Sequence, residues 1–515
     1  MRNWVLDGSL IVASCMKTGA DSVPTWLEAA LSQGHRFWVY VGQLQSMRTD
    51  LIRKLTESGA DQPEATAMSR LASSLSRCQW LAALAEDGDV LAEADLIGAQ
   101  LRKAAARLGG NSCILTDDPQ RIAEGKPFCT VARLQELSAS SGGSDGIAFI
   151  DLASQQDRIR PALESALHQV LHHGRYIQGP EIEALEKRLA DYVGVEHCVG
   201  VSSGTDALLI ALMALGIGPG DEIITTAFSF AATAEAVLLL GARPVYVDID
   251  PVTFNIDVSL IEEKINARTR AILPVGLYGQ CPDFPAMRLV ARQHGLALIE
   301  DAAQSFGATQ DGMRSGSLGT IGATSFFPAK PLGAYGDAGA CFTNDADLMM
   351  RLRELRDHGQ SRRYHHVRLG INARMASIQA AVLLQKLTVF DDELVMRQRA
   401  AQCYQTLLQE SASDMGMTLP VVAPGNTSSW AQYTVRIGHR DQIQAVLAQR
   451  GVPTAVHYPA PIPVQPAMVD SSGQYPVSVR SAQSVLSLPM HPYLNSATQQ
   501  HIAQQLIQAV KETIA

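Results

Sequence analysis

The stretch that decides the fold is a short apolar run ending in two carboxylates, Leu296-Ala297-Leu298-Ile299-Glu300-Asp301-Ala302-Ala303-Gln304. The apolar residues followed by charged ones predict a buried strand with Asp301 at its carboxyl end. Ligands of α/β proteins bind at this end of the strands, and a carboxylate there can pair with the protonated nitrogen of a pyridine ring. The alternative is that Asp301 caps the next helix.

A single lysine lies downstream in Ser325-Phe326-Phe327-Pro328-Ala329-Lys330-Pro331-Leu332-Gly333. Apolar surroundings disfavour the protonated amine, and a neutral ε-amine can form a Schiff base with an aldehyde cofactor. The alternative is a lysine whose stem packs on apolar groups while its ammonium reaches water. The residues upstream favour the first interpretation.

A turn rich in hydroxyl groups, Ser202-Ser203-Gly204-Thr205-Asp206-Ala207-Leu208, separates a β-like run (198–201) from an apolar helix expected over 207–217. Backbone N–H groups, hydroxyls and the positive end of the helix dipole suit a phosphate there. Ordinary helix capping explains the same residues, so this turn alone is a weak signal.

Strand-like and helical patterns alternate after residue 148. Apolar runs are expected as strands over 222–226, 244–248, 271–275 and 296–299. A helix is expected over 181–193, with Ile182, Leu185, Leu189 and Val193 on one face. This alternation predicts an α/β fold with a mostly parallel sheet. Beyond about 383, helices and a strand-like run at 432–437 predict a smaller α+β domain.

The Ser/Gly/Thr turn, the strand-end aspartate and the lysine, in this order, resemble the fold-type I pyridoxal-phosphate (PLP) enzymes. Four more stretches resemble the DegT/DnrJ/StrS-type nucleotide-sugar aminotransferases, namely 240–248, 279–283, 333–339 and 370–375. The resemblance covers about Phe149 to the C-terminus. It implies an α/β fold-type I PLP-dependent transferase, with a PLP-binding large domain over 148–385 and a small C-terminal domain over 386–515.

The resemblance also implies roles for individual residues. Lys330 matches the lysine that carries the Schiff base, and Asp301 matches the aspartate at the pyridine nitrogen. The other cofactor contacts that it implies are Gln304 near the 3-hydroxyl, Gly204, Thr205 and Ser325 at the phosphate, and Phe230 stacked on the ring. For Phe230 alone, a core position is the simpler interpretation. Asn372 matches a residue that reaches the neighbouring subunit's cofactor, which implies a homodimer with shared active sites.

The substrate side is implied by His358-Gly359-Gln360-Ser361-Arg362-Arg363-Tyr364-His365-His366, which resembles the branch acting on UDP-linked 3-keto sugars with a 2-acetamido group and a C6 carboxylate. Arginine and histidine suit anionic groups, although a solvated basic turn is the alternative. The expected substrate contacts are Arg362, Tyr364, His365, Arg374, His457 and Tyr458. Pro463 stands where many members of the family have histidine.

The implied reaction is transamination from glutamate to UDP-2-acetamido-2-deoxy-3-keto-glucuronic acid, with pyridoxamine phosphate as intermediate, in polysaccharide or O-antigen precursor synthesis. Three alternatives stay open: a 4-keto-6-deoxy acceptor, a sugar 3-dehydratase, and a non-catalytic PLP-binding regulator. The dehydratases have histidine in place of the Schiff-base lysine, so Lys330 argues against them.

A Gly/Ser-rich linker over 138–147 separates this region from an N-terminal segment over 1–137. In that segment Asp7, Asp95 and Asp118 follow β-like runs or begin a helix, and such carboxylates can converge on Mg²⁺ or Mn²⁺. The arrangement resembles a small α/β PIN-like ribonuclease domain, the one part of the chain for which nucleic acid is a candidate partner. Gln43 and Gln45 stand where a further acidic residue is usual, which favours a degenerate docking domain over an active nuclease.

Composition sets limits on the class of protein. The chain has 515 residues and a net charge of -9, which argues against nucleic-acid binding by the whole chain. Its 8 cysteines form no CxxC pair and are expected to be reduced thiols. Neither an apolar run long enough for a membrane span nor a signal-peptide pattern is evident, so a cytoplasmic location is expected.

Overall fold

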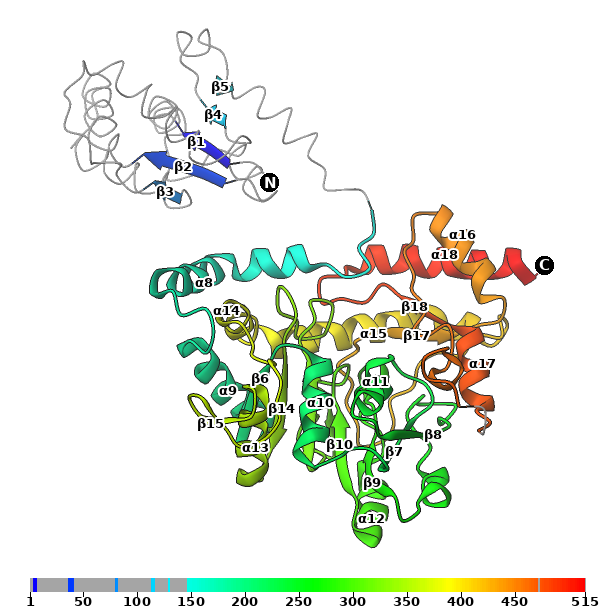
Figure 1. The fold of residues 1–515 in the computed structure, drawn as a ribbon. Coiled ribbons are helices and arrows are strands. Elements are labelled where there is room, and N and C mark those ends of the chain that lie inside the picture. Colours follow the sequence, from blue (N-terminus) through cyan, green and yellow to red (C-terminus); the bar gives the residue numbers. More distant parts are fainter. Residues whose placement is uncertain are drawn as a thin grey trace, which may run out of the picture. The chain divides into compact units, whose positions relative to one another are not determined.

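The computed structural model describes residues 146–470 and 473–514 and, before them, the backbone of five short strands. The chain divides into two compact units, Met1–Asp145 and Gly146–Ala515. The strands of the first unit pair in parallel, in the order β3-β2-β1-β4-β5 (Figure 1). They are β1 (Asn3–Leu6), β2 (Arg36–Tyr40), β3 (Gln79–Leu81), β4 (Cys113–Leu115) and β5 (Phe128–Cys129).

The predicted acidic site of the first unit lies outside the described residues, because Asp7, Asp95 and Asp118 are not among them. The same holds for 138–145 of the predicted linker. A parallel sheet fits an α/β fold, but the PIN-like assignment stays a prediction.

The second unit is built on a seven-stranded sheet in the order β6-β14-β13-β10-β9-β7-β8. Its strands are β6 (His197–Val201), β7 (Glu222–Thr226), β8 (Arg243–Val247), β9 (Thr269–Leu273), β10 (Ala297–Asp301), β13 (Ile321–Ser325) and β14 (Gly339–Thr343). Within this sheet β14 runs antiparallel to both neighbours and the other pairings are parallel. The predicted mostly parallel sheet is therefore confirmed.

Helices cover both faces of this sheet. Successive residues of a strand point to opposite sides, so neighbouring residues of one strand pack against different helices. Ile223 packs with α10 (Gly204–Ala214), α11 (Ala232–Leu239) and α13 (Ala346–Arg356) on one face. Ile224 packs with α12 (Phe284–His294) on the other. That second face is also covered by α9 (Pro180–Val193) and α14 (Ser377–Lys386). The predicted apolar face of α9 is confirmed as buried.

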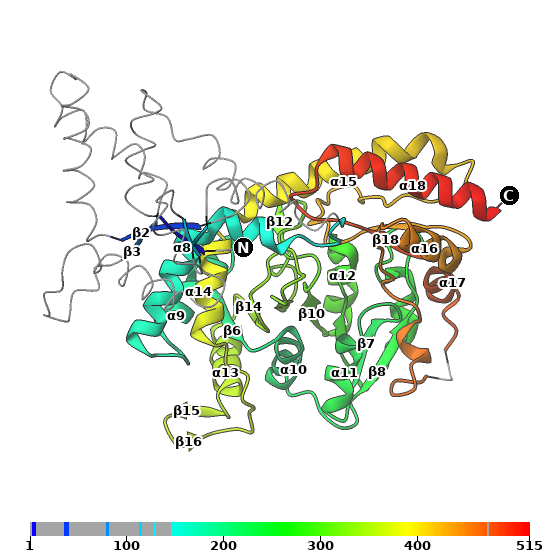
Figure 2. The same ribbon diagram turned by 90° about the horizontal axis from the view of Figure 1, so that it is seen from above.

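The C-terminal region has a core of its own, as the sequence predicts. Strands β17 (Tyr433–Arg436) and β18 (Val485–Leu488) pair antiparallel. They pack with α15 (Phe390–Ala412), α16 (Arg440–Gln449) and α18 (Ser496–Ile514), and α17 (Pro476–Ser484) leads into β18 (Figures 1 and 2). This is an α+β arrangement, smaller than the region before it, while the division at 385/386 stays a prediction.

The first residues of the second unit belong to this C-terminal core. Ile147 packs against its apolar cluster, and the backbone N–H of Met490 donates to the Phe149 carbonyl at 3.2 Å. Asp151 then caps α8 (Leu152–His173) by accepting from the backbone N–H of Ser154 at 2.9 Å. Among the described helices, none is both long enough and apolar enough to cross a membrane.

Candidate active site

A cavity of about 500 Å³ lies at the carboxyl ends of the parallel strands. Its wall comes from the end of β10, the starts of α10 and α11, the loop after β13 and two C-terminal stretches, and Phe149 and Ile150 complete it. The predicted site residues in its lining are Gly204, Thr205, Phe230, Asp301, Gln304, Ser325, Lys330, His457 and Tyr458. Predicted site residues up to 254 positions apart, from Gly204 to Tyr458, thus meet in one place.

The amine and the carboxylate at the centre of the cavity influence each other. Burial lowers the pKa of Lys330, and the negative charge of Asp301 opposes part of that effect. Burial raises the pKa of Asp301, while hydrogen bonds and Lys330 act in the opposite direction. An amine that loses its proton more readily is a better nucleophile towards a carbonyl carbon.

The Asp301 carboxylate is buried, with 4% of the residue exposed, and two donors hold it. The backbone N–H of Ala303 donates to Oδ1 at 3.1 Å, and the Thr233 hydroxyl donates to Oδ2 at 2.9 Å. Thus Asp301 ends a strand, as predicted, and turns rather than a helix follow it in the chain. The capping alternative is wrong.

The N-terminus of α10 forms another part of the cavity wall. Ser203 caps this helix, because its Oγ accepts from the Asp206 backbone N–H at 3.0 Å. The helix therefore begins at Gly204, three residues before the predicted start. A Cβ added at Gly204 would lie 2.5 Å from the Cβ of Ser325, so glycine lets the two segments approach. Free N–H groups and hydroxyls at a helix start suit an anion such as phosphate.

Polar and aromatic groups line the remaining wall. Gln304 accepts from the Tyr278 backbone N–H at 3.0 Å and donates to the Tyr458 hydroxyl at 3.2 Å. The Phe230 ring lies beside Tyr458, with centroids 6.1 Å apart. Burial and the charge of Lys330 lower the pKa of His457 to about 4, so this imidazole is neutral near pH 7 and its Nδ1 lies 2.9 Å from the Ser487 hydroxyl.

Five predicted residues lie outside the lining of this cavity. Three are on the exposed hairpin of β15 (Gln360–Arg362) and β16 (His365–His366), beyond α13 in Figure 2, namely Arg362, Tyr364 and His365. The other two are adjacent at the base of this hairpin, where Arg374 donates to Asn372 Oδ1 at 3.0 Å and to Asp357 at 2.8 Å.

Several residues of the site were not predicted from the sequence. Thr233 and Ser229 lie in the turn and first residues of α11, and both line the cavity. Phe149 contacts the site by lying near His457, with ring centroids 6.3 Å apart. The sequence shows Thr233 three positions after Phe230, but only the fold shows that its hydroxyl contacts Asp301.

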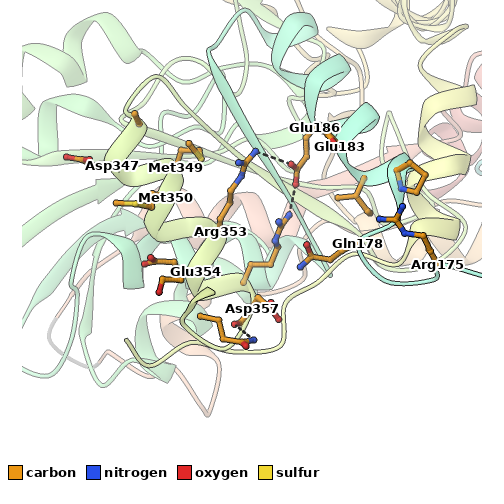
Figure 3. A pocket seen from close by; sticks show the side chains of 17 residues that line it. Arg175, Gln178, Glu183, Glu186, Asp347, Met349, Met350, Arg353, Glu354 and Asp357 are labelled. Carbon is orange, nitrogen blue, oxygen red and sulfur yellow. Dashed lines mark hydrogen bonds and ion pairs between the residues drawn. The ribbon is translucent and has the colours of Figure 1, made fainter. Parts of the chain in front are cut away.

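A second cavity, of about 870 Å³, lies between α9 and α13 (Figure 3). There Glu186 accepts from Arg356 and lies 3.5 Å from the Arg353 guanidinium, and Arg356 also donates to the Gly200 carbonyl at 2.9 Å. Glu186, Arg353 and Arg356 are thus paired with one another within the chain. In the described part of the chain, no group of three or more metal-ligating side chains is present.

Comparison with known sequences gives the family. The family model of the DegT/DnrJ/EryC1/StrS aminotransferases matches residues 157–507. The UDP-2-acetamido-2-deoxy-3-oxo-D-glucuronate aminotransferase of Pseudomonas aeruginosa is 53% identical over 352 residues, covering 68% of this chain and 97% of that protein. The pleiotropic regulatory protein of Geobacillus stearothermophilus is 42% identical over 363 residues, covering 70% and 97%.

Solved structures agree with these matches. A DegT DnrJ EryC1 StrS aminotransferase from Brucella abortus has a TM-score of 0.68 and 43% identity, covering 70% of this chain and 98% of that one. The S. venezuelae DesV, in complex with a ketimine intermediate, has a TM-score of 0.68 and 40% identity, covering 72% and 98%. On the family match and these identities, this chain belongs to the DegT/DnrJ/EryC1/StrS aminotransferase family.

Proposed function

We propose that this protein transfers an amino group from L-glutamate to a UDP-linked keto sugar, with UDP-2-acetamido-2-deoxy-3-keto-glucuronic acid as the acceptor. The observation that carries this proposal is the 53% identity to the Pseudomonas aeruginosa aminotransferase, of which the chain covers 97%. The product would serve polysaccharide or O-antigen precursor synthesis. The described cysteines are free thiols, which suits a reducing compartment such as the cytoplasm.

PLP is the cofactor of this family, and a solved relative from Bacillus subtilis holds PMP. The cavity fits this group. Lys330 supplies an amine for the aldehyde, and the start of α10 supplies donors for the phosphate. Asp301 supplies a buried carboxylate for the ring nitrogen. The close approach of Gly204 to Ser325, which a Cβ would obstruct, supports a phosphate cradle here.

When bound, PLP supplies an electron-withdrawing ring. The chain's own residues would do the rest. Lys330, with its lowered pKa, can accept and return a proton at its Nζ. Asp301 places a buried carboxylate in the cavity, and Gln304 orients the Tyr458 hydroxyl at 3.2 Å. Phe230 and Phe149 add apolar surface to the cavity wall.

We also propose a homodimer with shared sites. Asn372 and the hairpin residues lie outside the cavity of their own chain, and Tyr364 is 79% exposed. Val367 and Leu369, beside them, are 47% and 91% exposed, so this hairpin carries several exposed apolar side chains close together in sequence. In a homodimer, Asn372 and the hairpin residues could line the cavity of the neighbouring subunit. Mixing inactive Lys330→Ala chains with inactive Asn372→Ala chains should then restore activity, because a mixed dimer has one intact site.

A regulatory role is the second candidate, because the Geobacillus stearothermophilus relative is named a pleiotropic regulatory protein. A 4-keto acceptor is the main alternative substrate. Acceptor assays with the UDP-3-keto uronate and with a dTDP-4-keto-6-deoxy sugar, under the same conditions, distinguish the substrates. Absence of turnover with every acceptor, in a protein that binds PLP, would favour the regulator.

The decisive experiment is the absorbance spectrum of the purified protein with PLP, before and after L-glutamate. We expect a visible band that glutamate removes, and turnover when the UDP-3-keto uronate is added. Lys330→Ala should lose the visible band and lower turnover by at least about 10³-fold. Lys187→Ala, at an exposed position on α9, is the matched control. A wild-type protein that binds no PLP would refute the enzyme proposal.

A further inference from the structure

Thr233 contacts the carboxylate on which the proposed chemistry depends. It is 1% exposed and lies in the first turn of α11, three residues after Phe230. Its hydroxyl donates to Asp301 Oδ2 at 2.9 Å across 68 residues of sequence. A threonine at the N-cap position would accept a hydrogen bond from its own helix. In α11 the N-cap residue is Ala231, and Thr233, two residues later, directs its hydroxyl to Asp301.

A second hydroxyl supports the first. The Ser229 Oγ lies 3.3 Å from the Thr233 Oγ1, and both residues line the cavity. Since a hydroxyl has one proton, Thr233 can donate to Asp301 while it accepts from Ser229. Hydrogen bonds arranged in such a chain polarise one another and strengthen the last donor. The hydrogen bond from Ser229 to Thr233 would therefore make the Thr233 hydroxyl a stronger donor to the Asp301 carboxylate.

The carboxylate needs such a donor because it is buried. Burial by itself favours the protonated, neutral form, and the groups that oppose it are the Ala303 N–H, the Thr233 hydroxyl and the charge of Lys330. Tyr458 also faces Asp301, and burial together with the carboxylate raises the pKa of this phenol, so it stays neutral. Of the side chains that oppose protonation, Thr233 alone does so by a hydrogen bond among the described residues.

We propose that Thr233 is a positioning residue that keeps Asp301 ionised and fixes the direction of its carboxylate towards the ring nitrogen of the cofactor. The inference rests on the proposed function, because it assigns a role towards PLP. It adds a residue to Asp301 and Lys330. The segment that leads into α11 would then contact the cofactor twice, because Phe230 would cover the ring and Thr233 would hold the carboxylate at the ring nitrogen.

The test is Thr233→Val, which keeps the shape of the side chain and removes the hydroxyl. Loss of a hydrogen bond to a charged group should weaken PLP binding about 10- to 100-fold and lower kcat by a similar factor. The pH at which the visible band titrates should also shift. Thr233→Ser, which restores the hydroxyl, should return these values towards wild type.

Thr225→Val is the matched control. Thr225, on β7, is also fully buried, and its hydroxyl donates to the carbonyl of Leu273 on β9 at 2.7 Å. This variant should lose stability without moving the titration of the visible band. If the two valine variants behave alike, or if Thr233→Val keeps the wild-type titration and PLP affinity, the inference is wrong.

Infrared spectroscopy of the PLP-free protein separates this inference from the proposed function. In Thr233→Val the absorption of a protonated carboxyl should be present at a higher pH than in wild type, and it should disappear when Asp301→Asn is added. This result does not need PLP, so it tests Thr233 even if the wild-type protein binds no cofactor. An unchanged carboxyl signal would overturn the role of Thr233.

Discussion

The ammonium nitrogen of Lys386 lies 4.2 Å from the centre of the Tyr335 ring, and it has no hydrogen-bond partner among the described residues. Tyr335 belongs to the loop that follows Lys330, and its backbone N–H donates to Gln379 at 2.9 Å. Gln379 and Lys386 are both on α14. This helix thus contacts the loop that follows Lys330 twice, through the Gln379 hydrogen bond and through the buried Lys386 ammonium on the face of the Tyr335 ring.

We expect the stability that Lys386 contributes to rise with pH. Burial, opposed in part by Glu393, lowers the pKa of Lys386 from 10.5 to about 8. Between these values the unfolded chain binds more protons than the folded one, so stability increases with pH across this window. Relative to Lys386→Met, the wild type should gain up to about 3 kcal/mol between pH 8 and pH 10.5. Denaturant unfolding of both proteins at several pH values measures this gain.

The control for this titration is Lys187→Met, at an exposed lysine paired with Asp191 at 3.1 Å. Its unfolding free energy should follow the wild type at every pH. A constant difference between Lys386→Met and wild type would contradict the prediction.

Gly204→Ala should weaken cofactor binding. The new Cβ would meet the Cβ of Ser325 at 2.5 Å, so one of the two segments must move. Overpacking of this kind costs about 1–3 kcal/mol, and here it acts on the predicted phosphate site. Titration with PLP measures the affinity. Gly218→Ala, where no atom lies within 4 Å of the added Cβ, should bind PLP as the wild type does.

Asp248 should stabilise the attachment of α17 to the large sheet. Its carboxylate accepts from the backbone N–H groups of Val477 at 2.8 Å and Ser478 at 2.9 Å, and from the Ser478 hydroxyl at 2.5 Å. In Asp248→Asn one of the two acceptor oxygens becomes an NH₂ group that faces the donors on its side, so the unfolding free energy should fall by about 1–3 kcal/mol. Chemical denaturation checks this. Asp345→Asn, at an exposed cap of α13, should cost less.

His457 should contribute no ionisation to the activity above about pH 5. Its pKa is lowered to about 4, so the neutral form that contacts Ser487 is present throughout this range. His457→Gln should therefore change the size of kcat/KM but not the shape of its pH profile between pH 5 and 8. Loss of an inflection near pH 6.5 in this variant would mean that the imidazole titrates in the working enzyme.

Much of the fold of the second unit could be predicted from local pattern. The run 222–226 coincides with β7, and the run 244–248 is displaced from β8 by one residue. The start of α10 was misplaced because Ser203 caps the helix and adds Gly204 to its first turn. The position of β14 between β6 and β13 could not be predicted, since strand order depends on connections that no local pattern records.

The site was predictable where one residue and its neighbours carry the chemistry, as for Lys330 and Asp301, whose roles stay predictions. Thr233 was missed because its partner lies 68 residues away and a threonine near a helix start is common. Arg362 and His365 were expected at the substrate, yet the hairpin that carries them lies outside the cavity of its own chain. The local pattern of this hairpin does not record where it lies relative to the cavity.

The short stretch from Ile147 to Ile150 sets a limit for anyone who redesigns this chain. Ile147 packs against the C-terminal core, and Phe149 and Ile150 line the cavity, so removal of these residues would disturb both. A shortened version that begins at Gly146 keeps both, whereas one that begins a few residues later would open the reaction chamber to water. Exchange of the N-terminal segment for a tag or another module should likewise keep the junction upstream of Ile147.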